Sequence, residues 1–132
     1  MQITNNIIGV DLGGTNIRAG KIIGEKIVCL TKLPTPSKGS VEEVMDQIYA
    51  AIDDCVDGYS VSIGVGVPSV VDVEQGIVYD VTNIPSWKVV RLKELLEIRY
   101  NLPVFVNNDA NCFSVGEKFF GKAKPFKNIV GV

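Results

Sequence analysis

The sequence predicts an α/β domain on a mixed five-stranded sheet, in which an antiparallel meander is followed by parallel strands with crossover helices. Three apolar runs near the start of the chain are joined by short turns that contain glycine. Farther along, segments of helical periodicity alternate with short apolar runs, which is typical of parallel strands joined by helices. The length of 132 residues and the apolar content of 46% suit one domain with a substantial core.

The expected elements follow one another in the order βββ-α-β-α-β-α-β. The meander occupies residues 7–12, 17–23 and 26–33, and a proline-, serine- and glycine-containing stretch over 34–39 ends it. Ser40 followed by Glu43 is a capping-box signature, which predicts a helix beginning there. Apolar residues recur at helical spacing as far as Cys55, and Gly58 ends the helix.

The second half of the chain continues this alternation of strands and helices. An almost entirely apolar run over 61–67 predicts a strand that is buried on both faces, and a polar hairpin follows around residues 74–76. The later elements are a helix over 91–100, a strand over 104–106, a helix over 109–120 and an apolar strand from 128 to 132. We expect Met45, Phe113, Phe119, Phe120 and the cysteines in the core.

Composition excludes several classes of function. A net charge of −2 offers no attraction for nucleic acid or an anionic membrane, and no apolar run approaches the length of a membrane span. The start of the chain does not read as a signal peptide, and three scattered cysteines fit reduced cytoplasmic thiols. Because the chain has no histidine, any general base here is a carboxylate, a lysine or a thiolate, and histidine-ligated zinc is excluded.

The first candidate site is the stretch from Asp11 to Asn16, with the sequence DLGGTN. A buried strand brings Asp11 to its end, where the backbone N–H groups of Gly13 and Gly14 and the Thr15 hydroxyl can face phosphate oxygens. Asp11 can hold a hydrated Mg²⁺. The stretch matches neither the Walker nor the dinucleotide glycine motif. The alternative is a glycine hairpin capped by an aspartate, but the unbroken succession of Asp, Gly-Gly and Thr-Asn favours a phosphate site.

The second candidate site follows the expected strand over 104–106. Asn107, Asn108, Asp109 and Asn111 stand at its carboxyl end, the usual position of ligand sites in α/β sheets. Asparagine amides can exchange hydrogen bonds with sugar hydroxyls, and Asp109 can accept a proton from one. Helix capping also favours these residue types, but three asparagines and one aspartate in five residues exceed what a cap requires.

Two weaker signals accompany these sites. The turn from Gly66 to Ser69 would let a ligand approach the backbone closely, and Asn83 offers another amide. The alternative for both is structural, a strand exit and a proline turn with Trp87 as a surface anchor, and these residues alone favour neither interpretation. Glu117 fits a charge on a helix surface better than a ligand.

In order and spacing, these motifs resemble the ROK family of bacterial sugar kinases and sugar-responsive repressors. The matching elements are Asp11-Leu12-Gly13-Gly14-Thr15-Asn16, Gly66-x-Pro68, Asn83-x-Pro85-x-Trp87 and Asn108-Asp109-Ala110-Asn111 with Gly116-Glu117. The resemblance covers residues 7–132. Its first element is shared by the wider actin-like ATPase superfamily, so the implied fold is an actin-like, ribonuclease H-like ATPase domain, whereas the Asn-Asp-Ala-Asn element is more specific to ROK kinases.

The resemblance implies ATP-dependent phosphorylation of a hexose, as in a glucokinase, or of an N-acetylhexosamine. Asp109 would be the catalytic base that takes the proton of a sugar hydroxyl as this attacks the γ-phosphate of ATP, and Asn108 would bind the sugar. Asp11 would lie near Mg²⁺, through water. Further sugar contacts would come from Gly66, Ser69 and Asn83. The rest of the first phosphate loop would be Gly13, Gly14, Thr15 and Asn16.

The chain departs from the family pattern at two positions and in extent. Ser69 and Ser86 stand where glycine is more usual, and either can alter the fit of the sugar. Because the chain ends inside the apolar run 129–132, we expect residues 1–132 to be a single N-terminal lobe of a longer kinase. The second phosphate loop, the adenosine pocket and a structural zinc are expected only in the C-terminal part. We therefore expect the lobe alone to be inactive, and a homo-oligomer is compatible with the full-length protein.

Two other classes of function remain open. One is a sugar-sensing ROK repressor that lacks its DNA-binding domain, and the other is an actin-like ATPase module that does not act on sugars. Only six residues precede Ile7, where such repressors usually carry a helix-turn-helix, and the acidic balance argues against DNA binding. An actin-like module would share the phosphate loop but would not need Asn108 and Asp109.

Overall fold

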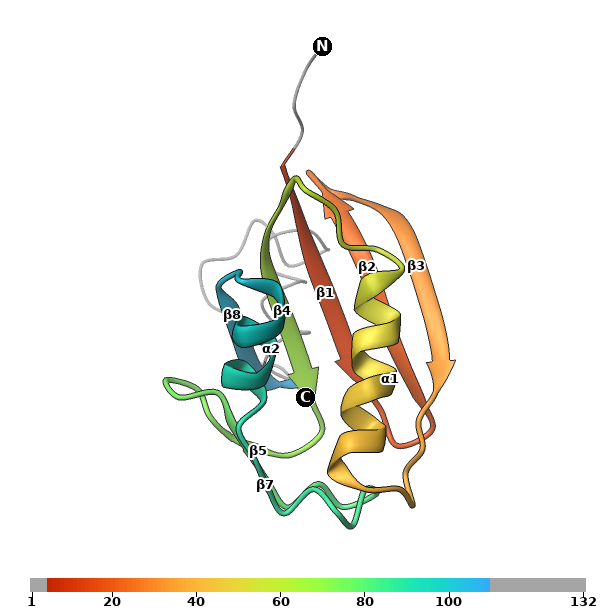
Figure 1. The fold of residues 1–132 in the computed structure, drawn as a ribbon, viewed down its shortest axis with the longest axis vertical. Coiled ribbons are helices and arrows are strands. Elements are labelled where there is room, and N and C mark those ends of the chain that lie inside the picture. The colour runs from red at the N-terminus through yellow and green to blue at the C-terminus, as the bar shows by residue number, and fades with distance from the viewer. Residues whose placement is uncertain (1–4, 110–132) are drawn as a thin grey trace, which may run out of the picture.

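A mixed five-stranded sheet forms the centre of the computed structural model, which describes residues 5–109. The strand order is β3-β2-β1-β4-β8, with β1, β2 and β3 antiparallel and β4 and β8 parallel to β1 (Figure 1). The bounds of these strands are β1 Asn6–Leu12, β2 Asn16–Ile23, β3 Lys26–Pro34, β4 Ser60–Val67 and β8 Val104–Asn108. The predicted fold class, an antiparallel meander followed by parallel strands, is confirmed.

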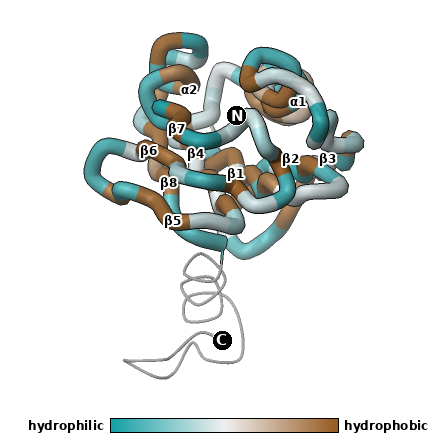
Figure 2. Tube along the Cα trace, turned by 90° about the horizontal axis from the view of Figure 1, so that it is seen from below, coloured by the Kyte–Doolittle hydropathy of each residue, from teal (hydrophilic) through white to brown (hydrophobic). Residues whose placement is uncertain are grey.

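Two helices cover the same face of this sheet. Figure 1 shows α1 (Val41–Asp53) and α2 (Leu92–Tyr100) in front of the strands, and Figure 2 shows both helices on one side of the sheet. Neither of these described helices is both long and apolar enough to span a membrane. Alternate residues of β1 point toward the helices and are buried, whereas Asp11 lies on the opposite, helix-free face.

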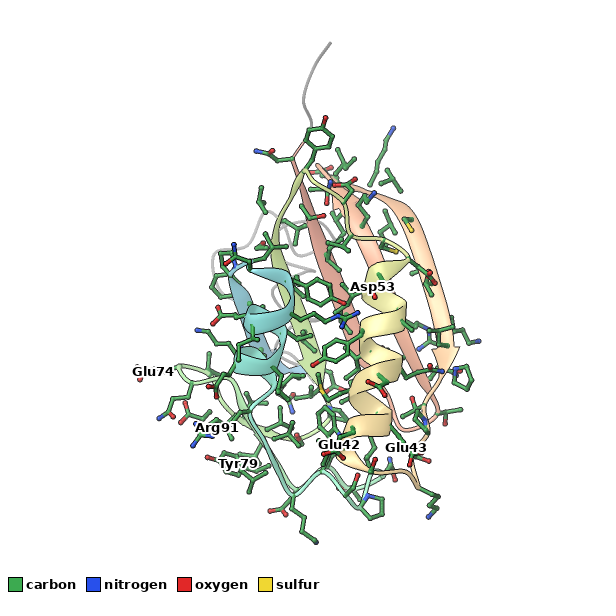
Figure 3. All side chains as sticks on the ribbon, viewed as in Figure 1. Glu42, Glu43, Asp53, Glu74, Tyr79 and Arg91 are labelled. Carbon is green, nitrogen blue, oxygen red and sulfur yellow. The ribbon has the colours of Figure 1, made fainter. Side chains whose placement is uncertain are left out.

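Helix α1 begins where the capping signature predicts. The Ser40 hydroxyl accepts a hydrogen bond of 3.1 Å from the Glu43 N–H, and Figure 3 shows Glu42 and Glu43 together at this end of the helix. The buried face of α1 consists of Val44, Met45, Ile48, Ala51 and Ile52. The helix ends at Asp53 rather than continuing through Cys55, because the Cys55 N–H already bonds to the Ile52 carbonyl in a tighter turn. Cys55 is nevertheless buried, as predicted, whereas Cys29, also expected in the core, is only half-buried because it lies on the edge strand β3.

A second, smaller antiparallel sheet lies beside the first. It consists of β5 (Val70–Asp72), β6 (Ile77–Tyr79) and β7 (Val89–Val90). The predicted hairpin around residues 74–76 connects β5 to β6, and Gly76 adopts the left-handed conformation that its turn requires. The sequence did not predict β7, because a strand of two residues carries no periodicity.

Two predicted features differ from the structure. Strand β8 continues through Asn107 and Asn108, because their pairing with Gly66 and Val67 of β4 extends the ladder beyond the predicted end at residue 106. Trp87 is fully buried rather than a surface anchor, since its segment folds inward against the core. Asp109 is helical. The rest of the helix predicted over 109–120, the strand from 128, and Asn111, Cys112, Phe113, Glu117, Phe119 and Phe120 lie outside the described residues.

Candidate functional site

The two candidate sites lie at the same edge of the sheet. The carboxyl ends of β1, β4 and β8 meet at the lower end of Figure 1. Asp11 pairs with Gly66, and Gly66 pairs with Asn107, so these three residues form a row across adjacent strands. Because neighbouring strands lie about 4.8 Å apart, the Cα atoms of Asp11 and Asn107 are separated by about 10 Å. Asp109 comes two residues farther along, where the chain leaves β8.

The charge of Asp109 acts on Asp11. Partial burial raises the pKa of Asp11, the Arg18 guanidinium lowers it, and the negative charge of Asp109 raises it again. Arg18 faces Asp11 from β2, with Nη1 3.7 Å from the carboxylate, and both side chains remain about half exposed. A carboxylate whose charge is disfavoured by a second carboxylate, at an accessible strand end, is suited to binding a cation.

The hairpin between β1 and β2 is fixed at its turn. The Gly13 N–H donates to the Asn16 carbonyl at 2.9 Å, so Gly14 and Thr15 are the two central residues. This bond corrects the expectation that both glycine N–H groups face a phosphate: the turn itself uses that of Gly13. Gly14 and Thr15 therefore offer the backbone donors and the hydroxyl that remain at the tip.

Thr35 holds this turn from outside, a role that the sequence analysis missed. Its hydroxyl donates to the Gly13 carbonyl at 2.7 Å, and its N–H donates to the Thr15 carbonyl at 2.9 Å. Thr35 lies in the stretch over 34–39, which the sequence predicts only as the end of the meander. No local motif identifies it, because the contact depends on how β3 exits the sheet. Arg18 was also missed, although the hairpin register places it opposite Asp11.

Asn83 packs directly on the hairpin between β1 and β2. A Cβ atom added to Gly14 would lie 2.8 Å from Asn83 Cβ and 3.1 Å from its Nδ2. Asn83 belongs to the tight segment that connects β6 to β7, and that segment is anchored by the buried Trp87. Asn83, one of the two weaker signals in the sequence, therefore lies in contact with the first candidate site.

The turn from Gly66 to Ser69, the other weak signal, is hydrogen-bonded to the second candidate site. Asn108 Nδ2 donates to the Ser69 carbonyl at 2.9 Å, and the Asn108 N–H donates to Asn107 Oδ1 at 2.8 Å. The Ser69 hydroxyl is buried and has no hydrogen-bond partner within residues 5–109. A buried hydroxyl that lacks a partner is costly, so this group is suited to a hydrogen bond from a ligand.

A hollow of about 250 Å³ opens on the helix-free face beside Asp11 and Arg18. Its floor includes Gly9 and Gly20, and its walls are mainly apolar, with Ile22, Ile27 and Leu30. Only the end at Asp11 and Arg18 is polar, so the hollow is poorly suited to phosphate or sugar. We therefore define the candidate site by the strand ends. No cluster of three or more metal-binding side chains occurs in the described part of the chain.

Replacing Gly14 with alanine tests the contact between the hairpin and Asn83. Because the added Cβ would lie 2.8 Å from Asn83 Cβ, one segment must shift. We expect a loss of about 1–3 kcal/mol in the free energy of unfolding, measured by urea denaturation. Gly58→Ala is the matched control, because a Cβ there meets nothing within 4 Å. Equal stability of the two variants would contradict the contact.

The sheet order and the glycine hairpin that follows its first strand define the actin-like ATPase fold, which this chain shares with solved ROK sugar kinases. The ROK family pattern matches residues 7–132, and the chain belongs to the ROK family. A glucokinase from Streptomyces coelicolor is 39% identical over 125 residues, which cover 93% of this chain and 38% of that protein. The chain therefore spans about two fifths of the length of such relatives.

Other relatives extend the comparison to solved structures and to repressors. A ROK family glucokinase from Streptomyces griseus, solved in complex with glucose and AMPPNP, superposes with a TM-score of 0.81 at 37% identity. That match covers 90% of this chain and 38% of the neighbour. A xylose repressor from Bacillus subtilis is 42% identical over 72 residues, 54% of this chain and 18% of the repressor. Kinases and repressors are thus both represented among the relatives.

Proposed function

We propose that this chain is the lobe of an ATP-dependent hexose kinase that holds the sugar and the first phosphate loop. The observation that carries the proposal is the meeting of Asp11 and Asp109 at one sheet edge, close enough for the Asp109 charge to raise the pKa of Asp11. Phosphoryl transfer needs an acceptor hydroxyl and a phosphate held side by side, with charge neutralised between them. Because the chain spans about two fifths of its kinase relatives, the activity is proposed for the complete protein.

In this proposal Asp109 is the base. Its exposed carboxylate accepts the proton of a sugar hydroxyl as the hydroxyl oxygen attacks the γ-phosphate. Asn108 hydrogen-bonds a neighbouring sugar hydroxyl and is itself oriented by the Ser69 carbonyl. Gly66 leaves room for the sugar between Asp11 and Asn107, and the Ser69 hydroxyl gains the partner that it lacks. Asn83 contributes a further amide from the side of the hairpin.

Asp11 and the hairpin are proposed to hold the phosphates and the metal. The Gly14 N–H and the Thr15 backbone and hydroxyl groups donate to phosphate oxygens, while Gly13 and Asn16 close the turn that presents them. Asp11 would hold Mg²⁺ through water, and the nearby Asp109 charge makes this edge of the sheet suited to a cation. Bound Mg²⁺ supplies charge neutralisation on the transferring phosphoryl group.

A coupled kinase assay on the complete protein tests this function. We expect ATP-dependent phosphorylation of at least one sugar in a panel of hexoses and N-acetylhexosamines. The repressor relatives provide the second candidate, a sugar sensor without catalysis. Isothermal titration with the same panel separates the two, because a sensor binds sugar but consumes no ATP. A protein that binds ATP yet none of these sugars would favour the actin-like module instead.

A further inference from the structure

We propose that Cys29 and Cys55 form a reversible disulfide in response to small-molecule disulfides, which makes this pair a redox modification site. The two cysteines are 26 positions apart in the chain, on β3 and just after α1. In the fold their Sγ atoms lie 2.7 Å apart, and both are free thiols. The pair is separate from the edge of the sheet that carries Asp11 and Asp109, so the proposal does not depend on the proposed kinase function.

Neighbouring atoms hold both sulfurs in place. Cys29 Sγ donates to the Asp54 carbonyl at 3.6 Å, and Cys55 Sγ donates to the Ala19 carbonyl at 3.7 Å. The Thr31 hydroxyl lies 3.9 Å from Cys55 Sγ. The surrounding backbone therefore holds the two sulfur atoms side by side, and a bond between them needs only a small approach.

The two thiols have different access to solvent, which sets the order of reaction. Cys29 is half-buried on the edge strand β3, whereas Cys55 is only 2% exposed. Burial, assisted by the hydrogen bond with Cys29, raises the pKa of Cys55 to about 11. Cys29 is therefore the thiol that reacts first.

The chemistry is a pair of thiol–disulfide exchanges. The Cys29 thiolate attacks one sulfur of a small disulfide such as oxidised glutathione, forms a mixed disulfide and releases one thiolate, which takes up a proton. Cys55 then loses its proton to water and attacks Cys29 Sγ, which releases the second thiol. Overall the two cysteines lose two electrons and two protons, and the small disulfide is reduced to two thiols. The product links β3 to the carboxyl end of α1.

Peptide mass spectrometry under non-reducing conditions tests the proposal on the purified protein. After treatment with oxidised glutathione we expect a peptide pair linked through Cys29 and Cys55, which dithiothreitol separates again. Because the cross-link restricts the unfolded chain, the melting temperature is expected to rise by about 5–10 °C. Cys29→Ser is expected to abolish both effects, and Cys55→Ala should leave glutathione attached to Cys29.

Cys112→Ser is the matched control and is expected to behave as the wild type does. Glutathione that stays on Cys29 of the wild type, without the link to Cys55, would overturn the proposal. So would a disulfide that includes Cys112, or a Cys29→Ser variant whose melting temperature still rises with the oxidant.

Discussion

Asp109→Asn is expected to lower the kcat of sugar phosphorylation by about 10²–10⁴-fold, because a carboxamide cannot take the proton of the attacking hydroxyl. The isosteric change keeps the position of Asn108 and its bond to the Ser69 carbonyl, so sugar affinity should change far less than kcat. Steady-state kinetics with ATP and the best sugar of the panel measure the first effect, and calorimetric titration of the sugar measures the second. Asp46→Asn, on the exposed side of α1, is the control.

A second measurement distinguishes the closeness of Asp109 to Asp11 from the role of Asp109 as the catalytic base. Since the Asp109 charge raises the pKa of Asp11, its removal should lower that pKa, which an NMR titration of the Asp11 carboxyl group can follow. If Asp109→Asn lowers the Asp11 pKa but leaves kcat unchanged, Asp109 does lie close to Asp11 but is not the base. A strongly reduced kcat with a lowered Asp11 pKa is the expected combination.

Trp87→Ala is expected to have the largest effect on stability, a loss of about 3–5 kcal/mol in the free energy of unfolding. Trp87 is fully buried, and its backbone closes the segment that carries Asn83: the Val81 N–H donates to the Trp87 carbonyl at 3.0 Å, and the Trp87 N–H donates to the Ile84 carbonyl at 2.9 Å. Removing the indole leaves a cavity beneath this segment. Urea denaturation followed by far-UV circular dichroism measures the loss, because Trp87 is the single tryptophan and its fluorescence disappears with it.

Trp87→Phe is the informative comparison for that variant. Within the described residues, Trp87 Nε1 is buried without a hydrogen-bond partner. Phenylalanine keeps most of the apolar volume and removes this unpaired donor, so we expect a clearly smaller loss than for alanine. If the alanine and phenylalanine variants were equally stable, packing of the aromatic ring at position 87 would not be what stabilises the segment between β6 and β7.

Both candidate sites and most of the fold could be predicted because their signals are local. Asp11 and the two glycines follow a recognisable apolar strand, and Asn108 and Asp109 follow another. The carboxyl ends of parallel strands share one edge of a sheet, so the approach of the two sites follows from the strand order. The Ser40 cap was predictable for the same reason, since its partner Glu43 is three residues away.

The contacts that hold these sites in place could not be predicted. Thr35 reaches the hairpin from the exit of β3, and Asn83 reaches Gly14 from a segment between two very short strands. The burial of Trp87 depends on that same segment folding inward. Each contact joins residues far apart in the chain. The course of a loop without periodicity cannot be predicted from its local sequence.

By itself the sequence determined the class of the sheet, an antiparallel meander followed by parallel strands, as well as the two polar motifs at strand ends and the ROK family of the chain. Each of these rests on short-range patterns of residue type. Only the tertiary structure decided the strand order of the sheet, that the Asp109 charge reaches Asp11, that Asn83 packs on Gly14, and that Cys29 lies beside Cys55. These are distances between separate elements, and they are set by how the helices and connecting segments pack on the sheet.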